Sequence, residues 1–146
     1  MNMNEKNYEA LKLEGQLCFP LYACSREVIK QYTPLLNAID LTYTQYITME
    51  VLWEHGSLNL KELGKMIYLD SGTLTPVLKT LQNKGYITRK RSLQDERLLI
   101  IDLTESGMAL KEKALAIPEL NDNYYNLTEE ELMDLKRLLF KVISDF

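Results

Sequence analysis

The chain has 146 residues, 46% of them hydrophobic, which is enough for one globular domain with its own core. Its net charge is −4, and it has no run of about 18 or more apolar residues of the kind that spans a bilayer. The first ten residues, MNMNEKNYEA, lack the basic start and the apolar stretch of a secretory signal. With only two cysteines, a structural disulfide is not expected. Composition therefore predicts a soluble, cytoplasmic protein with no membrane partner.

The first helical pattern covers about residues 8–32, with apolar side chains along one side. Pro20 lies inside this pattern. Because a proline nitrogen carries no hydrogen, we expect a kink just before Pro20, where Cys18 lies. Thr33 is expected to cap a short second helix with Pro34 at its first position.

Side chains that can cap a helix precede each of the later helical patterns. The patterns predict capping boxes of Thr42 with Gln45 and of Thr128 with Glu131, and single caps at Asn59 and Thr104. The helix after Thr104 is expected to run to residue 117, where Pro118 stops it. The chain is therefore predicted to be mainly α.

A further helix is expected over about residues 72–84, with Ser71 as its N-cap and Gly85 just after its end. Pro76 would fall near the first turn, where its missing N–H costs least. An apolar stripe at i, i+3, i+4 and i+7 would face a core, and its members are Leu74, Val77, Leu78 and Leu81. The other face of this helix is polar and almost free of acid.

Two strand-like runs follow this helix, YITRKR and LLIIDL, separated by the polar SLQDER. The helix NLKELGKMIY precedes it, and residues 57–59 are expected to add a minor third strand. Two short helices with a tight connection and then a β-hairpin make a winged helix-turn-helix, which we place over residues 41–104.

Charge is distributed unevenly between this unit and the rest of the chain. Residues 57–103 contain eight bases and five acids, a balance of +3, which leaves −7 elsewhere in a chain of net charge −4. A basic unit in an acidic protein is typical of a double-stranded DNA reader rather than of a solubilising surface. The expected major-groove residues are Ser71, Thr73, Thr75, Pro76 and Lys79; the expected wing residues are Arg97, oriented by Asp95, with Arg89 and Arg91.

The stretch DSGTLTPVLKTLQNKGYITRKRSLQDERLLIIDLTESG resembles the helix-turn-helix and wing of the multiple antibiotic resistance regulator (MarR) family. The Asp-x-Arg motif of that wing is matched by Asp95-Glu96-Arg97. The segment LCFPLYACSREVIKQYTPLLNAIDLTYTQY is similar to the organic hydroperoxide resistance regulators, whose LCF-x-LYA segment holds a sensing cysteine. Together the similarities cover roughly residues 11–118. They imply one MarR-type domain over residues 1–146, in which residues 1–40 and 105–146 form a homodimer interface and the dimer reads a pseudo-palindromic operator.

The resemblance also implies a function for Cys18, which from its residue type alone could equally be a small hydrophobic core residue. An organic hydroperoxide would oxidise Cys18, and a low-molecular-weight thiol would close a mixed disulfide. The matching tyrosines are Tyr32 and Tyr43, with Tyr22 nearby, and their hydroxyls would favour the thiolate. Cys24 lies too far along a helix to pair with Cys18 and is expected in the core.

Two other functions stay open at the level of sequence. A reversibly bound aromatic compound could release such a repressor, and the aromatic residues that could line its site are Tyr22, Tyr32, Tyr43, Tyr46 and Trp53. A thiol peroxidase is the enzymatic alternative, but no Pro-x-x-x-Thr-x-x-Cys segment precedes either cysteine. We expect no enzyme activity, no cofactor and no metal site at the single histidine, His55. Met49, Trp53 and Met66 are expected in the core.

Overall fold

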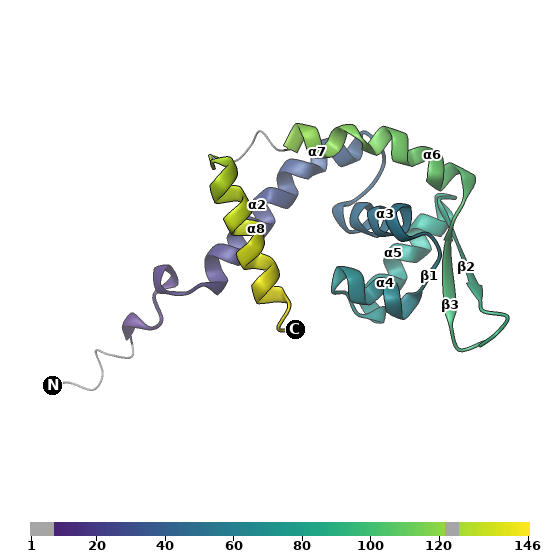
Figure 1. The fold of residues 1–146 in the computed structure, drawn as a ribbon, viewed down its shortest axis with the longest axis horizontal. Helices are drawn as coiled ribbons and strands as arrows, with labels where there is room; N and C mark the ends of the chain where they lie inside the picture. Colours follow the sequence, from purple (N-terminus) through teal and green to yellow (C-terminus); the bar gives the residue numbers. More distant parts are fainter. Residues whose placement is uncertain (1–7, 122–125) are drawn as a thin grey trace.

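The protein is described here by a computed structural model that covers residues 8–121 and 126–146, and Figure 1 shows its path. One 3-10 turn, seven α-helices and three strands are present in this part of the chain. In order they are η1 (Leu13–Gly15), α2 (Cys18–Asn37), α3 (Tyr43–His55), β1 (Leu58–Asn59), α4 (Leu60–Ile67), α5 (Ser71–Asn83), β2 (Ile87–Arg91), β3 (Leu99–Leu103), α6 (Glu105–Ala114), α7 (Ala116–Asn121) and α8 (Glu129–Ile143).

The elements divide into two lobes. Helices α3, α4 and α5 and the sheet gather at one side of the molecule, while α2 and α8 lie at the other (Figure 1). Helices α6 and α7 run along one edge and connect the two lobes, and α7 packs against α2. The predicted mainly α fold with a small β wing is confirmed.

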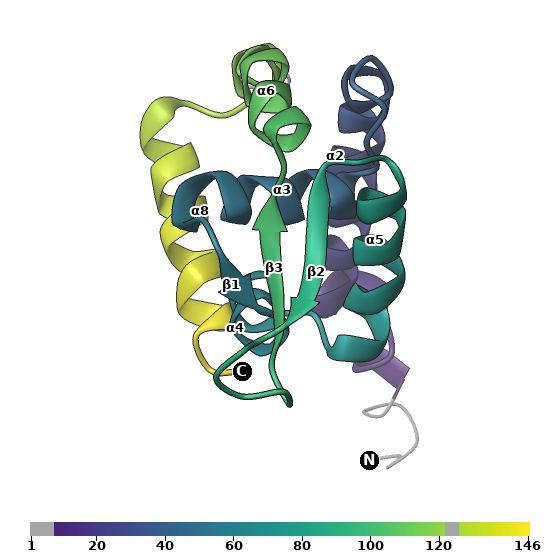
Figure 2. The same cartoon turned by 90° about the vertical axis from the view of Figure 1, so that its right-hand side faces the viewer.

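The three strands form one antiparallel sheet in the order β1-β3-β2. Strand β3 lies in the middle of the sheet (Figure 2). Ile101 of β3 lies opposite Leu58 of β1 and Arg89 of β2. The loop between β2 and β3 extends beyond the sheet as the wing. The predicted hairpin and minor third strand are both confirmed.

The core lies where α3, α4 and α5 meet the sheet. Leucines from the predicted stripe on α5 are fully buried, and Met49, Leu52, Leu63, Ile87 and Ile101 pack with them. Val77, the fourth member of that stripe, is partly buried at the edge of this core. One expectation is wrong: the Met66 side chain is 43% exposed, because it lies on the outer face of α4.

Four of the predicted helix caps are present, and those at Ser71 and Thr33 are wrong. Thr42 with Gln45 and Thr128 with Glu131 form capping boxes, and Thr104 accepts a hydrogen bond from the Gly107 N–H. The cap of α5 is Asp70 and not Ser71, because the Asp70 carboxylate accepts from the Thr73 N–H at 2.8 Å. Asn59 also forms a box, with Glu62.

Two prolines lie in the first turn of a helix, at positions where the sequence predicted a kink or a helix end. Helix α2 begins at Cys18, so that Pro20 is its third residue, and Pro118 is the third residue of α7. In a first turn the backbone nitrogen has no partner within the helix, so a proline costs little there. The expected helix over residues 8–32 is therefore confirmed only from Cys18 onward, and the expected stop at Pro118 is wrong.

Two other prolines lie inside helices. Helix α2 continues through Pro34 to Asn37, and Thr33 donates to the Ile29 carbonyl at 3.2 Å instead of capping a new helix. The carbonyl that Pro34 leaves unpaired belongs to Lys30, an exposed residue whose backbone water can solvate. Pro76 is the sixth residue of α5, one turn later than expected.

Helices α2 and α8 have apolar faces that no other described residue covers. No described residue of α8 is buried, and Phe140 is 72% exposed. Other exposed apolar residues on the two helices include Phe19, Tyr22, Ile29, Leu135, Leu138, Leu139 and Val142. Surfaces of this kind indicate a protein interface. Within residues 8–121 and 126–146, no helix has the length and apolar content needed to cross a bilayer.

Candidate DNA interface and thiol sensor

The outer face of α5 presents a row of short polar side chains. Ser71, Thr73, Pro76 and Lys79 are exposed, whereas Thr75 is half-buried. The Thr75 hydroxyl donates to the Ser71 carbonyl at 2.6 Å, and the Thr73 hydroxyl donates to Asp70 at 3.1 Å. Both hydroxyls can still accept a hydrogen bond, and the methyl groups remain available for apolar contact.

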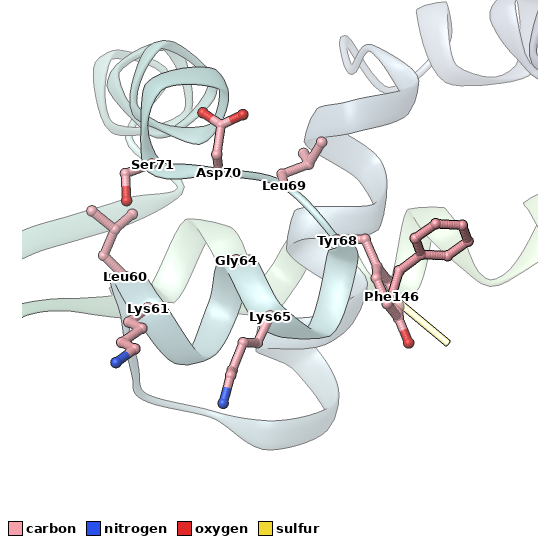
Figure 3. A pocket seen from close by; sticks show the side chains of 9 residues that line it. All are labelled: Leu60, Lys61, Gly64, Lys65, Tyr68, Leu69, Asp70, Ser71 and Phe146. Carbon is pink, nitrogen blue, oxygen red and sulfur yellow. The ribbon is translucent and has the colours of Figure 1, made fainter. Parts of the chain in front are cut away.

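A close backbone approach fixes the angle between α4 and α5. A Cβ atom on Gly64 would lie 2.6 Å from the Leu69 carbonyl oxygen, so the turn between the helices requires glycine at this position. Tyr68, at the end of α4, adopts a left-handed conformation with φ of 56°. Figure 3 shows the open cleft between α4 and the start of α5, which has a volume of about 780 Å³ and carries Lys61 and Lys65 on its α4 side.

In the wing, Arg97 forms a bidentate ion pair with Asp95. Arg97 Nε lies 3.0 Å from Asp95 Oδ1, and Nη2 lies 3.1 Å from Oδ2. Hydrogen bonds from the Arg97 side chain and backbone hold the pKa of Asp95 below its ordinary value, and the pKa of Arg97 is raised in return. The predicted orientation of Arg97 by Asp95 is confirmed. The Arg97 side chain is 90% exposed, so the remaining guanidinium N–H groups face outward.

Two other predicted arginines contact the protein itself. Arg89 Nε donates to the Gln82 side chain at 2.7 Å, which fastens β2 to α5. Arg91 donates to the Arg97 backbone carbonyl at 3.3 Å, which fastens the base of the wing loop. Neither contact uses all five guanidinium N–H groups, so both side chains can also meet an anion.

A groove between α5 and the wing brings several of these side chains together. It has a volume of about 480 Å³. Its lining includes Lys61, Ser71, Thr75, Arg89, Arg91 and Arg97. Five of the nine predicted DNA-binding residues thus line one basic groove. Thr73, Pro76 and Lys79 lie outside the groove, on the exposed face of α5. Asp95 does not line the groove, but it orients Arg97, which does. Lys61 was not among the predicted contacts.

Cys18 is the first residue of α2, and its side chain is exposed. Cys18 thus lies at the start of a helix and not at a kink inside a longer one. Tyr22, one turn further on, accepts a hydrogen bond from Arg26 at 2.8 Å, and the Arg26 guanidinium lies over the tyrosine ring.

Three tyrosines pack together at the other end of α2. The Tyr32 and Tyr43 rings meet edge to face at 5.2 Å between centroids, and Tyr46 lies 6.2 Å from Tyr32. Burial and a hydrogen bond with Glu50 raise the pKa of Tyr46 well above its usual range, so it stays a neutral phenol. Burial also raises the pKa of Glu50. Tyr46 belongs to this cluster but was not among the predicted sensor residues.

A single chain does not bring the predicted sensor residues together. Fourteen positions along a continuous helix separate Cys18 from Tyr32, a rise of roughly 21 Å. Cys24 lies on the same helix and is exposed, so its expected place in a core is wrong for the isolated chain. Trp53, also considered for an aromatic pocket, instead donates from its indole nitrogen to the Gly107 carbonyl at 2.8 Å.

Comparison with known proteins gives the chain a family. Residues 30–114 match the family model described as transcriptional regulator SarA/Rot. The chain is 50% identical to an organic hydroperoxide resistance transcriptional regulator of Bacillus subtilis, over 96% of this chain and 95% of that protein. It is 47% identical to the HTH-type transcriptional regulator SarZ of Staphylococcus saprophyticus, over 90% of each chain.

Among solved structures, the fold resembles that of AbfR, a protein of Staphylococcus epidermidis. Reduced AbfR bound to DNA is 33% identical, with a TM-score of 0.76 over 94% of this chain and 93% of that one. Disulfide-formed AbfR, also 33% identical, gives a TM-score of 0.59 over 98% and 94%. Overoxidized AbfR bound to DNA gives a TM-score of 0.74, so the fold described here is more similar to both DNA-bound AbfR structures than to the disulfide form. The chain belongs to the MarR-type winged-helix transcriptional regulators, within the group that includes the organic hydroperoxide resistance regulators.

Proposed function

We propose that this protein is a cytoplasmic, dimeric repressor that binds a pseudo-palindromic DNA operator and leaves it when an organic hydroperoxide oxidises Cys18. The observation that carries the proposal is the placement of Cys18 at the exposed start of α2, on a helix whose far end holds the tyrosine cluster. The relatives are transcriptional regulators, and this protein too would act as a regulator and not as an enzyme.

Residues 41–104 would read the DNA. Exposed Ser71, Thr73 and Lys79 on α5 would enter the major groove, and the Pro76 ring and the Thr75 methyl group would contact thymine methyl groups. The basic groove between α5 and the wing would receive the phosphate backbone through Arg89 and Arg91. Arg97, held outward by Asp95, would reach the neighbouring minor groove.

Residues 1–40 and 105–146 would form the dimer. The unpartnered apolar faces of α2 and α8 are the surface that a second copy would cover. In such a pair the Cys18 of one protomer can approach the Tyr32 and Tyr43 of the other, which the rise of about 21 Å forbids within one chain. The sensor would therefore exist only in the dimer, with Tyr22 beside the thiol.

Oxidation of Cys18 would proceed in two steps. The thiolate sulfur attacks one oxygen of the hydroperoxide, the O–O bond breaks, and the second oxygen leaves with the electron pair and takes up a proton to give an alcohol. The sulfur loses two electrons and becomes a sulfenic acid. A low-molecular-weight thiol then forms an S–S bond with that sulfur and its oxygen departs as water.

Release would follow from packing at the subunit boundary. An adduct on Cys18 adds volume where two protomers meet, so the tyrosine rings and the helices that carry them must move. The two winged units can engage half-sites only at one spacing, about one helical turn of DNA, so a small displacement weakens binding.

The test compares reduced and organic-hydroperoxide-treated protein for binding to a genomic operator fragment, with mass spectrometry of the Cys18 peptide. Binding by the reduced protein only, together with an oxidised Cys18 peptide, is the expected result. Replacing both Tyr32 and Tyr43 with Phe should slow that oxidation while leaving DNA binding by the reduced protein intact. Stable DNA binding by fully Cys18-oxidised protein would reject the proposal.

A further inference from the structure

We propose that Lys84 is a coupling residue that fastens the recognition helix α5 to the end of the sensor helix α2, so that movement of α2 is carried to the DNA-reading surface. The inference rests on the proposed function and adds the connection between its two sites. It concerns a residue for which the sequence pattern predicted no role.

The end of α2 is closed by a compact turn. The Asp40 N–H donates to the Asn37 carbonyl at 3.2 Å and the Leu41 N–H donates to the Leu36 carbonyl at 3.0 Å. Asp40 adopts a left-handed conformation with φ of 55°, as this type of helix ending requires. The turn therefore has one defined shape, fixed to the last residues of α2 by its own hydrogen bonds.

Lys84 holds this turn from across the fold. Its Nζ donates to the Asp40 backbone carbonyl at 2.5 Å and lies 3.3 Å from the Asp40 carboxylate and 3.3 Å from the Gln45 side-chain oxygen. The same Gln45 oxygen accepts from the Thr42 N–H at the start of α3. One ammonium group thus joins the end of α2 and the start of α3.

Lys84 itself belongs to the end of α5. It is the C-cap residue of that helix, and its backbone N–H donates to the Thr80 carbonyl. Asp40 and Lys84 are 44 positions apart, so the contact is made by the fold and not by local sequence. A displacement of the α2 end must therefore pull on α5 or break the contact.

Burial makes the contact hard to break. The Lys84 side chain is only 24% exposed, whereas the Asp40 carboxylate is 77% exposed, so the ammonium depends mainly on the Asp40 backbone carbonyl and the Gln45 side-chain oxygen. Removing partners from a mostly buried charge is costly, whereas an exposed ion pair exchanges readily with solvent. The contact therefore holds the end of α5 at a fixed position relative to the end of α2. The tyrosine cluster lies on the neighbouring turns of α2 and α3, so the Lys84 contact is close to where Cys18 oxidation would act.

The test measures how much oxidation weakens operator binding in Lys84→Met, which keeps the aliphatic stem and removes the charge. Lys84→Arg is the matched control, because a guanidinium can still donate to the turn. Three quantities are compared in the full-length dimer: the operator Kd of the reduced form, the operator Kd of the Cys18-oxidised form, and the rate of Cys18 oxidation. For the wild type, the ratio of oxidised to reduced Kd gives the full strength of coupling.

We expect Lys84→Met to lower the ratio of oxidised to reduced Kd on the order of ten-fold, as loss of a coupling residue does. The rate of Cys18 oxidation should not change in this variant. Lys84→Arg should keep the wild-type ratio. A wild-type ratio in Lys84→Met would overturn the inference. A lower ratio accompanied by slower Cys18 oxidation in Lys84→Met than in the wild type would also overturn it, since Lys84 would then act on the sensor chemistry.

Two further measurements keep the outcome clear. If Lys84→Met does not fold, Asp40→Asn replaces it, because Asn tolerates the left-handed turn and only the charge is lost. A smaller drop in the ratio is then expected, and an unchanged ratio would overturn the inference. Wild-type protein that keeps DNA after full Cys18 oxidation would overturn the proposed function together with this inference, whereas failure confined to the Lys84 and Asp40 variants would overturn the inference alone.

Discussion

At the scale of single residues, Arg97 is the side chain whose role in DNA binding can be isolated best. It is exposed, and among the described residues its side chain contacts the neighbouring Asp95. Arg97→Ala should therefore weaken operator binding by about 1–3 kcal/mol and lower the salt slope by about one, without changing the fold. Binding titrations over a range of salt concentrations measure both quantities.

Lys113→Ala removes an exposed positive charge outside the winged unit and is the control for net charge. It should leave affinity nearly unchanged. An Arg97→Ala variant that binds like the wild type, with the same salt slope, would mean that the wing makes no contact with DNA.

Glu50 gives a prediction for pH. Its pKa is raised above the ordinary value of 4.5, first by burial and also by the charge of Glu54, despite the hydrogen bond from Tyr46. A raised carboxyl pKa adds stability below the ordinary pKa, and this stability is lost as pH rises through the folded-state value. At neutral pH the ionised Glu50 is therefore unfavourable to folding.

Glu50→Gln should accordingly raise the midpoint temperature of thermal unfolding at pH 7. The gain in the free energy of unfolding should be less than about 1 kcal/mol, because the Glu50 side chain also reaches solvent. The gain should shrink as pH falls below 4.5, where the wild-type carboxyl is protonated in both states. Glu112→Gln, on the exposed side of α6, is the control. A gain in Glu50→Gln that is equal at pH 4 and pH 7 would contradict the assignment.

Sequence predicted residue roles well only where partners are neighbours in the chain. Asp95 and Arg97 are two positions apart, so their pairing could be read from the motif. Tyr46 joins the tyrosine cluster and Lys84 reaches Asp40 only because the fold brings separate helices together. Neither residue stands in a local pattern that distinguishes it from an ordinary core tyrosine or surface lysine.

At the scale of elements, the turn between α4 and α5 decides whether the recognition helix is presented correctly. Gly64→Ala places a methyl group 2.6 Å from the Leu69 carbonyl oxygen, which is backbone and cannot move aside easily. We expect a loss of about 1–3 kcal/mol in the free energy of unfolding, measured by urea denaturation. Gly15→Ala, whose Cβ would meet nothing within 4 Å, should unfold like the wild type. Equal stability of the two variants would show that the turn relaxes around the added methyl group.

The helix caps were predictable because a cap and its partner are three residues apart. Thr42 with Gln45 and Thr128 with Glu131 act as their spacing indicates. Prolines were less informative, since the missing N–H is harmless in a first turn but disruptive later, and sequence does not say which turn will hold the residue. Pro20, Pro34 and Pro118 were each misplaced by that ambiguity.

At the scale of the whole molecule, α8 carries the dimer prediction. Leu138 lies on its exposed apolar face, and Leu138→Glu would bury a charge between two protomers. We expect this variant to sediment as a monomer and to lose operator binding, because one half-site contact is far weaker than two. Lys136→Glu, roughly 200° away around the helix, should remain dimeric. A dimeric Leu138→Glu protein would show that α8 lies outside the interface.

The single-chain fold followed from sequence periodicity, but the sensor did not, because it is incomplete in one chain. Cys18 and Tyr32 share a helix and yet lie about 21 Å apart. Only the resemblance to thiol-based regulators indicated that they act together, through a second copy of the chain. In the proposed sensor, their contact would therefore cross the subunit boundary.

The most direct test of the account is release of DNA by hydroperoxide in two matched cysteine variants. Cys18→Ser and Cys24→Ser each remove one exposed thiol from α2, six positions apart on the same helix. Both should bind the operator like the wild type when reduced. After treatment with an organic hydroperoxide and a small thiol, Cys24→Ser should leave the DNA while Cys18→Ser stays bound; release of Cys18→Ser would contradict the account.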